Sequence, residues 1–298
     1  MRAAQRWAGR LAACWKRARS RHAWLDHTVR ALIRYDKADA GRLAAALTYY
    51  AFFATFALAL LGFAVLSRVL DQPAVLTEMQ RYLSDTFPRL DVQALRDAGG
   101  TAGLVACVVL PLTGLFWMDT LRSATRAIWR LEEYPGGFFL RQLIDLGILA
   151  GLGVLLSLSL AVAFAAEWVL TWLAVNTVGV QAAPAQWVLS VAAFVLGFGV
   201  NTLLAMALLT APPRLHLPPR RVIGPALVIT IGLEILKTIG QALLNLTAAN
   251  PAYQVVTGAV AMLLFLKVLN QLILFATALA ATSTTGAVTD LADRADPP

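Results

Sequence analysis

The chain has 298 residues, of which 59% are hydrophobic and 14% charged, with a formal net charge of +8. Soluble domains average about 45–50% apolar and about 25% charged residues, so this composition excludes an ordinary soluble fold. No charged residue occurs from Trp168 to Pro213 or from Thr238 to Leu266. Such stretches are long enough to cross a bilayer, which requires about 20 apolar residues.

The first 43 residues form a basic tail that holds eleven Lys or Arg. Within it, Trp7, Leu11 and Trp15 recur every four residues while the arginines lie mostly on other faces, a pattern typical of an amphipathic helix at a membrane surface. Each basic residue near anionic lipid contributes on the order of 1 kcal/mol to such binding. An unstructured tail that only sets the orientation of the chain fits the same residues, and both interpretations stay open. Because the positive charge is concentrated in this tail, we expect a surface anchor and no nucleic-acid partner.

Six apolar windows follow the tail, and each predicts a transmembrane helix. They cover residues 44–67, 101–119, 143–173, 187–211, 222–246 and 255–281. The predicted fold class is therefore all-α: a polytopic membrane domain of six transmembrane helices over residues 44–284, between the basic tail 1–43 and a short tail 285–298. One connection, residues 71–100, is long and alternates acidic with apolar residues, which predicts one or two short amphipathic helices outside the bilayer.

The distribution of Lys and Arg among the connections predicts the orientation of the chain, because positive residues are retained on the cytoplasmic side. With the amino terminus in the cytoplasm, nineteen Lys or Arg lie on the cytoplasmic side and three lie outside, all of them in the 71–100 connection. We therefore expect both ends of the chain in the cytoplasm.

Three charged residues lie deep inside the predicted spans: Glu234 and Lys237 in the fifth and Lys267 in the sixth. Charge at this depth is costly, so such residues are candidates for function. Glu234 and Lys237 are three positions apart and share a helix face. Glu234 lies about 18 Å from the cytoplasmic end of its span, and Lys267 about 18 Å from the outer end of the antiparallel neighbour. Over a hydrocarbon thickness of about 30 Å their depths differ by about 6 Å, so a bridge between Glu234 and Lys267 is sterically reasonable.

Two lysines against one glutamate leave a surplus positive charge, and two interpretations stay open. In the first, the three residues form a site for an anion such as a lipid phosphate. In the second, Lys237 extends to the interface and the remaining pair holds two helices together. Asn270, in the sixth span, either completes this polar interior or bonds one helix to another.

A basic stripe is predicted at the cytoplasmic end of the second span. Arg122, Arg126 and Arg130 recur every four residues beside Asp119, which places them on one face of a helix that continues the span. The stripe either binds phospholipid headgroups or only retains this end of the span in the cytoplasm, as positive residues generally do.

Residues suited to catalysis are scattered. The three histidines, His22, His27 and His216, all lie in predicted cytoplasmic segments, and the chain has no H-E-x-x-H, paired-cysteine, P-loop or G-x-S-x-G pattern. We therefore expect no catalytic, metal or cofactor site, and we disfavour a hydrolase or an ATPase.

Three stretches together carry a resemblance to a known family. The first is "RLAAALTYYAFFATFALALLGF" (Arg42 to Phe63), and the second is "LRSATRAIWRLEEYPGGFFLRQLIDL" (Leu121 to Leu146). The third is "GPALVITIGLEILKTIG" followed by "NPAYQVVTGAVAMLLFLKVLNQLILFATALAA" in the last two spans. Their order and spacing resemble the YihY/BrkB family of bacterial inner-membrane proteins, although Ala57 and Arg126 stand where the family usually has Pro and Asn.

The resemblance implies a multi-pass protein of the bacterial inner membrane with six spans and cytoplasmic ends. Members have been described as ribonuclease BN, as serum-resistance factors or as lipid transporters. We expect a transporter or flippase-like protein for an anionic lipid or another amphiphile, with anionic phospholipid as its partner. A non-transporting scaffold for envelope integrity is the alternative, and a membrane-bound ribonuclease is the least favoured.

Glycines of the third and fourth spans, such as Gly147 and Gly197, would permit close helix contacts within the chain or in a homo-oligomer.

Overall fold

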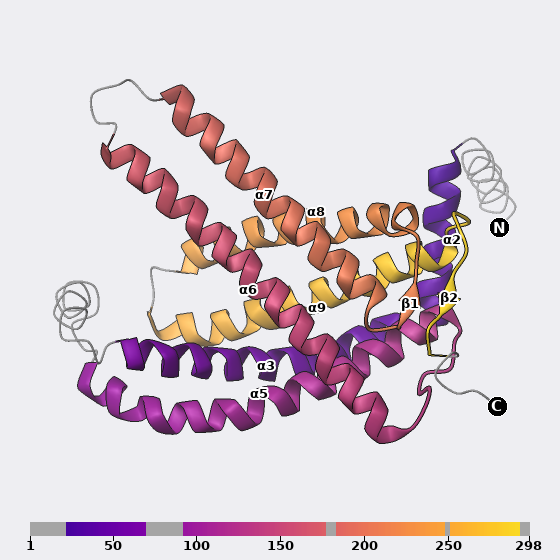
Figure 1. The fold of residues 1–298 in the computed structure, drawn as a ribbon, viewed down its shortest axis with the longest axis horizontal. Helices are drawn as coiled ribbons and strands as arrows, with labels where there is room; N and C mark the ends of the chain where they lie inside the picture. The colour runs from indigo at the N-terminus through magenta and orange to yellow at the C-terminus, as the bar shows by residue number, and fades with distance from the viewer. Residues whose placement is uncertain (1–21, 70–91, 177–182, 248–250, 293–298) are drawn as a thin grey trace, which may run out of the picture.

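The computed structural model describes residues 22–69, 92–176, 183–247 and 251–292 (Figure 1). The helices are α2 (Ala23–Lys37), α3 (Ala40–Val69), α5 (Val92–Trp129), α6 (Phe138–Asn176), α7 (Ala183–Thr210), α8 (Pro219–Thr247) and α9 (Pro251–Thr282). Two short strands, β1 (Leu215–His216) and β2 (Thr289–Asp290), complete the described elements. The described part is thus almost entirely helical, as the composition predicts.

The six long helices coincide with the six apolar windows of the sequence. Among the described residues, α3, α6, α7, α8 and α9 contain stretches long and apolar enough to cross a membrane. The second predicted span, 101–119, lies inside α5 and is helical, but α5 is not one of these five. Helices of 28 to 39 residues reach about 42 to 58 Å, so they are longer than a hydrocarbon layer of about 30 Å.

The long helices are arranged as three neighbouring pairs (Figure 1). α3 packs along α5, α8 packs along α9, and α3 also contacts α9. α6 and α7 form a hairpin that runs diagonally across the other helices and diverges from them at the end remote from α2 (Figure 1). The apolar windows of α6 and α7 are 11% and 6% buried, against 22% in α3, α8 and α9. The hairpin therefore lies at the periphery of the bundle.

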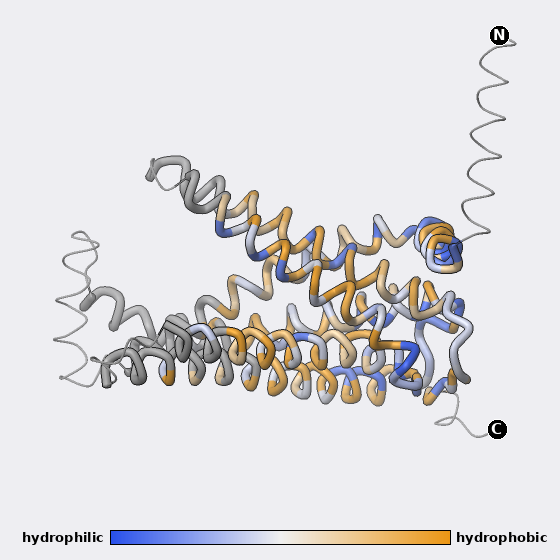
Figure 2. Tube along the Cα trace, turned by 90° about the horizontal axis from the view of Figure 1, so that it is seen from above, coloured by the Kyte–Doolittle hydropathy of each residue, from blue (hydrophilic) through white to orange (hydrophobic). Residues whose placement is uncertain are grey.

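Buried residues gather at the end of the bundle that carries α2, β1 and β2, which we call the α2 end. They include Leu47 of α3, Met118 and Leu121 of α5, Leu209 of α7, Val222 of α8 and Leu274 of α9. α2 lies across this end (Figure 1), and in the view from above it is seen along its axis, at a steep angle to the long helices (Figure 2). A helix in this direction runs parallel to the surface of a membrane that the long helices cross.

α2 is held mainly against α9. Ala31 is fully buried, the His27 ring Nε2–H donates to the carbonyl oxygen of Leu279 at 2.9 Å, and the ring of Tyr35 meets that of Phe275 edge-on. The sequence did not predict this helix as an element separate from the basic tail. The amphipathic helix that was predicted, around Trp7, lies outside the described residues.

The predicted 71–100 connection is shorter than expected. Residues 92–100 are the first residues of α5 and continue into the second apolar window without a break, because a helix does not have to end where its hydropathy falls. The short amphipathic helices predicted for the rest of this connection lie outside the described residues.

The carboxyl-terminal segment returns to the bundle instead of extending as a simple tail. β2 pairs antiparallel with β1, with Leu215 opposite Asp290 and His216 opposite Thr289, and Leu291 N–H donates to the Arg214 carbonyl at 3.0 Å. The turn before β2 contains Gly286 at φ +79, a backbone conformation that favours glycine. The first and the last described segments consequently lie at the same end of the bundle.

Candidate functional site

The charge pair predicted on the fifth span lies in the middle of α8. Lys237 Nζ donates to Glu234 Oε1 at 2.9 Å, and Asn201 Nδ2 of α7 donates to the same oxygen at 3.1 Å. The side chains of Lys237 and Glu234 remain 45% and 31% exposed, so the neighbouring helices do not seal the pair. Glu234 follows the first residue of α8, Pro219, by fifteen positions, which corresponds to about 22 Å along the helix. The carboxylate therefore lies far from either end of an apolar helix.

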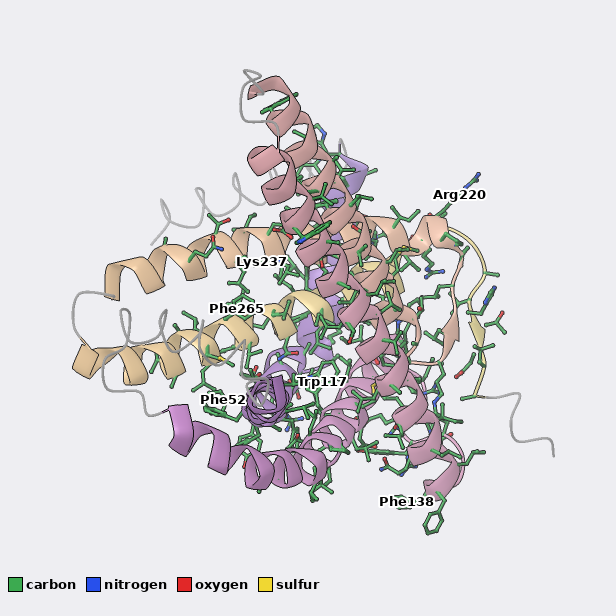
Figure 3. All side chains as sticks on the ribbon, turned by 60° about the vertical axis from the view of Figure 1, so that its left-hand side comes forward. Phe52, Trp117, Phe138, Arg220, Lys237 and Phe265 are labelled. Atoms are coloured by element: carbon green, nitrogen blue, oxygen red, sulfur yellow. The ribbon has the colours of Figure 1, made fainter. Side chains whose placement is uncertain are left out.

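Lys267 of α9 lies at a comparable depth, since it precedes the last residue of that helix, Thr282, by fifteen positions. Its side chain is exposed, and no hydrogen bond or ion pair joins it to another residue that the structure describes. The bridge predicted between Glu234 and Lys267 is not formed, because the Glu234 carboxylate is bound by Lys237 and Asn201 instead. Figure 3 shows Lys237 on α8 and Phe265 on the adjacent α9.

Uncharged polar residues also link neighbouring helices. Asn270 of α9 is 2% exposed and donates from Nδ2 to Thr48 Oγ1 of α3 at 3.4 Å. The hydroxyls of Thr202 on α7 and Thr230 on α8 lie 3.3 Å apart. The contact of Asn270 is thus between helices. The contact between the two threonines is not predictable from the sequence, because a threonine in an apolar span usually bonds only to its own helix.

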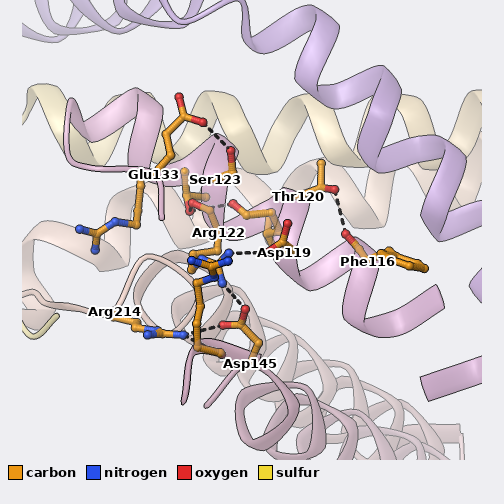
Figure 4. A network of polar contacts seen from close by, with 12 residues as sticks. Phe116, Asp119, Thr120, Arg122, Ser123, Glu133, Asp145 and Arg214 are labelled. Carbon is orange, nitrogen blue, oxygen red and sulfur yellow. Dashed lines mark hydrogen bonds and ion pairs between the residues drawn. The ribbon is translucent and has the colours of Figure 1, made fainter. Parts of the chain in front are cut away.

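The α2 end contains a second polar network, built on a buried carboxylate (Figure 4). Asp145 of α6 accepts hydrogen bonds from Arg122 of α5 and, at 2.9 Å, from Arg214 of the α7–α8 connection. Arg122 also donates to Asp119, one turn earlier on α5. Both Arg122 and Asp145 are fully buried, and because a buried charge is tolerated only when it is paired, these contacts fasten three segments together.

Arg126 fastens the carboxyl-terminal segment to α5. Its guanidinium donates to both carboxylate oxygens of Asp290, at 2.8 and 3.2 Å, and to the carbonyl of Pro213 at 2.9 Å. A further hydrogen bond runs from its Nε to the carbonyl of Glu132. The planar fork of arginine suits such a two-pronged contact with a carboxylate.

Arg122, Arg126 and Arg130 therefore do not form the continuous basic stripe that their spacing predicted. Arg122 and Arg126 are buried against carboxylates, and Arg130 alone is exposed. The helix ends at this point, and Arg130 has φ +60. The spacing of residues on one helix does not reveal carboxylates that approach from α6 and β2, and for this reason the predicted exposure of Arg122 and Arg126 is wrong.

Arg221, at the start of α8, holds the end of α9. It donates to the carbonyls of Ala280 at 2.8 Å, Gly286 at 3.0 Å and Ala281 at 3.3 Å, and its guanidinium lies over the Trp129 ring. These carbonyls belong to the last turn of α9 and the residues after it, where helices leave backbone oxygens without partners. From the sequence, Arg221 is only one of the positive residues that predict the orientation of the chain in the membrane.

The two networks differ in what they can do. Arg122, Arg126 and Arg221 at the α2 end are buried and bound to fixed protein groups, so they hold segments in place. The Glu234–Lys237 pair and Lys267 are accessible and lie at mid-depth, so they can meet a charged molecule. Among the described residues no group of three or more His, Cys, Asp or Glu side chains is placed to hold a metal ion.

Long apolar helices with polar groups held between them define a helical membrane protein. The chain belongs to the BrkB virulence factor family, whose model matches residues 31–297. The match begins inside α2 and includes all six long helices, and it confirms the resemblance that the three sequence stretches indicated. Neither the curated proteins nor the solved structures with which the chain was compared gave a match.

Proposed function

We propose that this member of the BrkB family is a multi-pass inner-membrane transporter or flippase-like protein that moves an anionic lipid or another amphiphile. In this proposal six helices span the membrane and the α2 end faces the cytoplasm. The observation that carries the proposal is the accessible Glu234–Lys237 pair in the middle of α8.

The position of the pair is costly for a purely structural element. A charged residue at the centre of a membrane helix costs roughly 3 kcal/mol on insertion scales, and pairing recovers only part of this cost. Structural ion pairs in membranes are expected to be enclosed by other helices. Glu234 and Lys237 keep about a third and nearly half of their side-chain surface exposed. This exposure supports contact with the polar group of a molecule that crosses the membrane.

Lys267 supports an anionic cargo over a cationic one. It lies at a depth similar to that of Glu234, and with Lys237 it gives two positive charges against one carboxylate at this depth. A phosphate group crossing the hydrocarbon layer would be stabilised by such cations, as charged pairs in low dielectric attract each other strongly. The apolar surfaces of α7 and α8 would accommodate the acyl chains of the same molecule.

A flipping assay in liposomes tests the proposal. Protein is reconstituted with fluorescent phosphatidylglycerol, and a membrane-impermeant reductant reports how fast the labelled lipid crosses. We expect wild type to accelerate crossing, and Lys267→Met and Glu234→Gln to slow it by about tenfold, the effect of losing roughly 1.4 kcal/mol of stabilisation. Ile235→Ala, an exposed apolar change on the same helix, should retain the wild-type rate.

The scaffold alternative predicts a different result. If the charges only hold helices together, wild type, the three variants and empty vesicles show equal crossing rates, although Glu234→Gln lowers thermal stability. Equal rates in correctly folded samples would remove the transport proposal.

A further inference from the structure

The carboxylate in the middle of α8 is bound through one of its two oxygens. Lys237 Nζ at 2.9 Å and Asn201 Nδ2 at 3.1 Å both donate to Oε1 of Glu234. No hydrogen bond from a described residue reaches Oε2. A proton on Oε2 would therefore leave the contact between Asn201 and Oε1 in place, since the carbonyl oxygen of a carboxylic acid still accepts a hydrogen bond.

Few charged groups on the neighbouring helices are available to this carboxylate. α8 packs against α7 and α9. α7 contains no charged residue, and Lys267 is the only charged residue of α9. No hydrogen bond or ion pair joins the side chains of Lys267 and Glu234. Within the described part of the chain, Lys237 is therefore the one cation bound to Glu234.

The carboxylate also lies at the edge of the buried part of the bundle. In α8, Thr230 is buried and none of the next twelve residues is. In α9, Asn270 is buried and none of the twelve residues before it is. Glu234 and Lys267 each lie about one helical turn beyond this edge, on the side where α6 and α7 diverge from the other helices (Figure 1). The bundle is thus packed between Glu234 and the α2 end, and it is open at Glu234 itself.

An anionic headgroup and Glu234 compete for the same cation. The Lys237 ammonium is bound to Glu234, so a phosphate oxygen that binds this ammonium takes it from the carboxylate. Glu234 then keeps only the N–H donor of Asn201, which is uncharged. A carboxylate without a cation is costly in the middle of a membrane, and it takes up a proton instead. Once it is neutral, it no longer competes with the phosphate for Lys237.

We propose that Glu234 takes up one proton for each anionic headgroup that binds Lys237, so that the lipid and a proton cross the membrane together. This inference rests on the proposed function and names the ion whose gradient drives it. The proton comes from water and forms an O–H bond at Oε2, while the ammonium of Lys237 passes from Oε1 to a phosphate oxygen. One negative and one positive charge are added, so the net charge of the site, Lys267 included, stays the same.

Lipid crossing under a proton gradient tests this coupling. The flipping assay with fluorescent phosphatidylglycerol is run with the outside near neutral pH and the vesicle interior about one pH unit lower or higher. The phosphodiester of this lipid keeps one negative charge throughout, so the cargo itself does not titrate. A protonophore, which collapses the gradient, is the control. The variants are Glu234→Gln, Glu234→Asp and Lys267→Met.

We expect wild type to move labelled lipid outward faster from an acidic interior than from an alkaline one, by up to about tenfold for each pH unit, the limit for one proton. The protonophore should remove this difference. Glu234→Gln cannot take up a proton and should show one rate under both gradients. Lys267→Met is expected to be slowed as much as Glu234→Gln, but it retains Glu234 and should keep the wild-type ratio of the two rates. Glu234→Asp should keep that ratio as well.

The outcomes separate this inference from the proposed function. If wild type accelerates crossing equally under both gradients, the proton coupling is overturned and the proposed function stands. A gradient response that persists in Glu234→Gln also overturns the coupling, because another group then carries the proton. If wild type is no faster than empty vesicles under either gradient, the proposed function fails, and this inference fails with it.

Discussion

Arg122 and Asp145 are 23 positions apart in the chain and form an ion pair in which both side chains are fully buried. The pair joins α5 to α6, and Asp145 also binds Arg214, so one carboxylate holds two guanidinium groups. Because neither arginine can lose its proton at ordinary pH, the stability of this end depends on that carboxylate.

Asp145→Asn is therefore expected to destabilise the protein by about 3–5 kcal/mol, the effect of leaving a buried charge without its partner. Asp119→Asn is the matched control, since Asp119 binds the same arginine but its side chain is 29% exposed, and a cost of about 1 kcal/mol or less is expected. Thermal unfolding in detergent measures both. Similar losses in the two variants would contradict the role assigned to Asp145.

The turn before β2 gives a prediction from backbone geometry. Gly286 has φ +79, and a methyl group added there would lie 2.5 Å from Cγ of Pro218. Gly286→Ala should cost at least about 1 kcal/mol and expose the carboxyl-terminal segment to proteases. Gly224→Ala is the control: an added Cβ there meets nothing within 4 Å, and alanine favours a helix by about 1 kcal/mol. A stable, protease-resistant Gly286→Ala protein would show that the segment is not held as described.

Two adjacent arginines at the start of α8 should respond differently to the same change. Arg221 donates to three backbone carbonyls in different directions, which an ammonium group on a flexible stem does not reproduce. Arg221→Lys is expected to cost about 2 kcal/mol, whereas Arg220→Lys at an exposed position should be neutral within about 0.5 kcal/mol. Thermal unfolding distinguishes the two variants. Equal stabilities would show that the hydrogen bonds from Arg221 to the three carbonyls do not stabilise the protein.

The long helices could be predicted from the sequence because hydropathy is a local property. The hydropathy of each apolar window depends only on the residues inside it, and each of the six windows coincides with a long helix. The β1–β2 pair could not be predicted, since two-residue strands have no periodicity and the paired residues lie 73 and 75 positions apart. α2 was missed because its apolar face is contained in a strongly basic tail.

In the candidate site, likewise, contacts within one helix could be predicted from the sequence and contacts between helices could not. The pair of Glu234 and Lys237 follows from a three-residue spacing on one helix, and the structure contains it. The bridge to Lys267 required the rotation of α8 relative to α9, which depth alone does not determine. Likewise, the burial of Arg126 depends on Asp290, 164 positions away, and no pattern within α5 indicates that contact.

The proposed function requires that charged molecules reach Lys267 in the middle of the bundle. Cys14 and Cys107 are replaced by Ser, a single cysteine is introduced as Lys267→Cys or Phe194→Cys, and the reconstituted protein is treated with a charged, membrane-impermeant thiol reagent. Phe194 is an exposed residue of an apolar span and serves as the lipid-facing control. We predict that Lys267→Cys is modified and that Phe194→Cys is not. If both cysteines remained unmodified, no aqueous path would reach Lys267, and the proposed function would be contradicted.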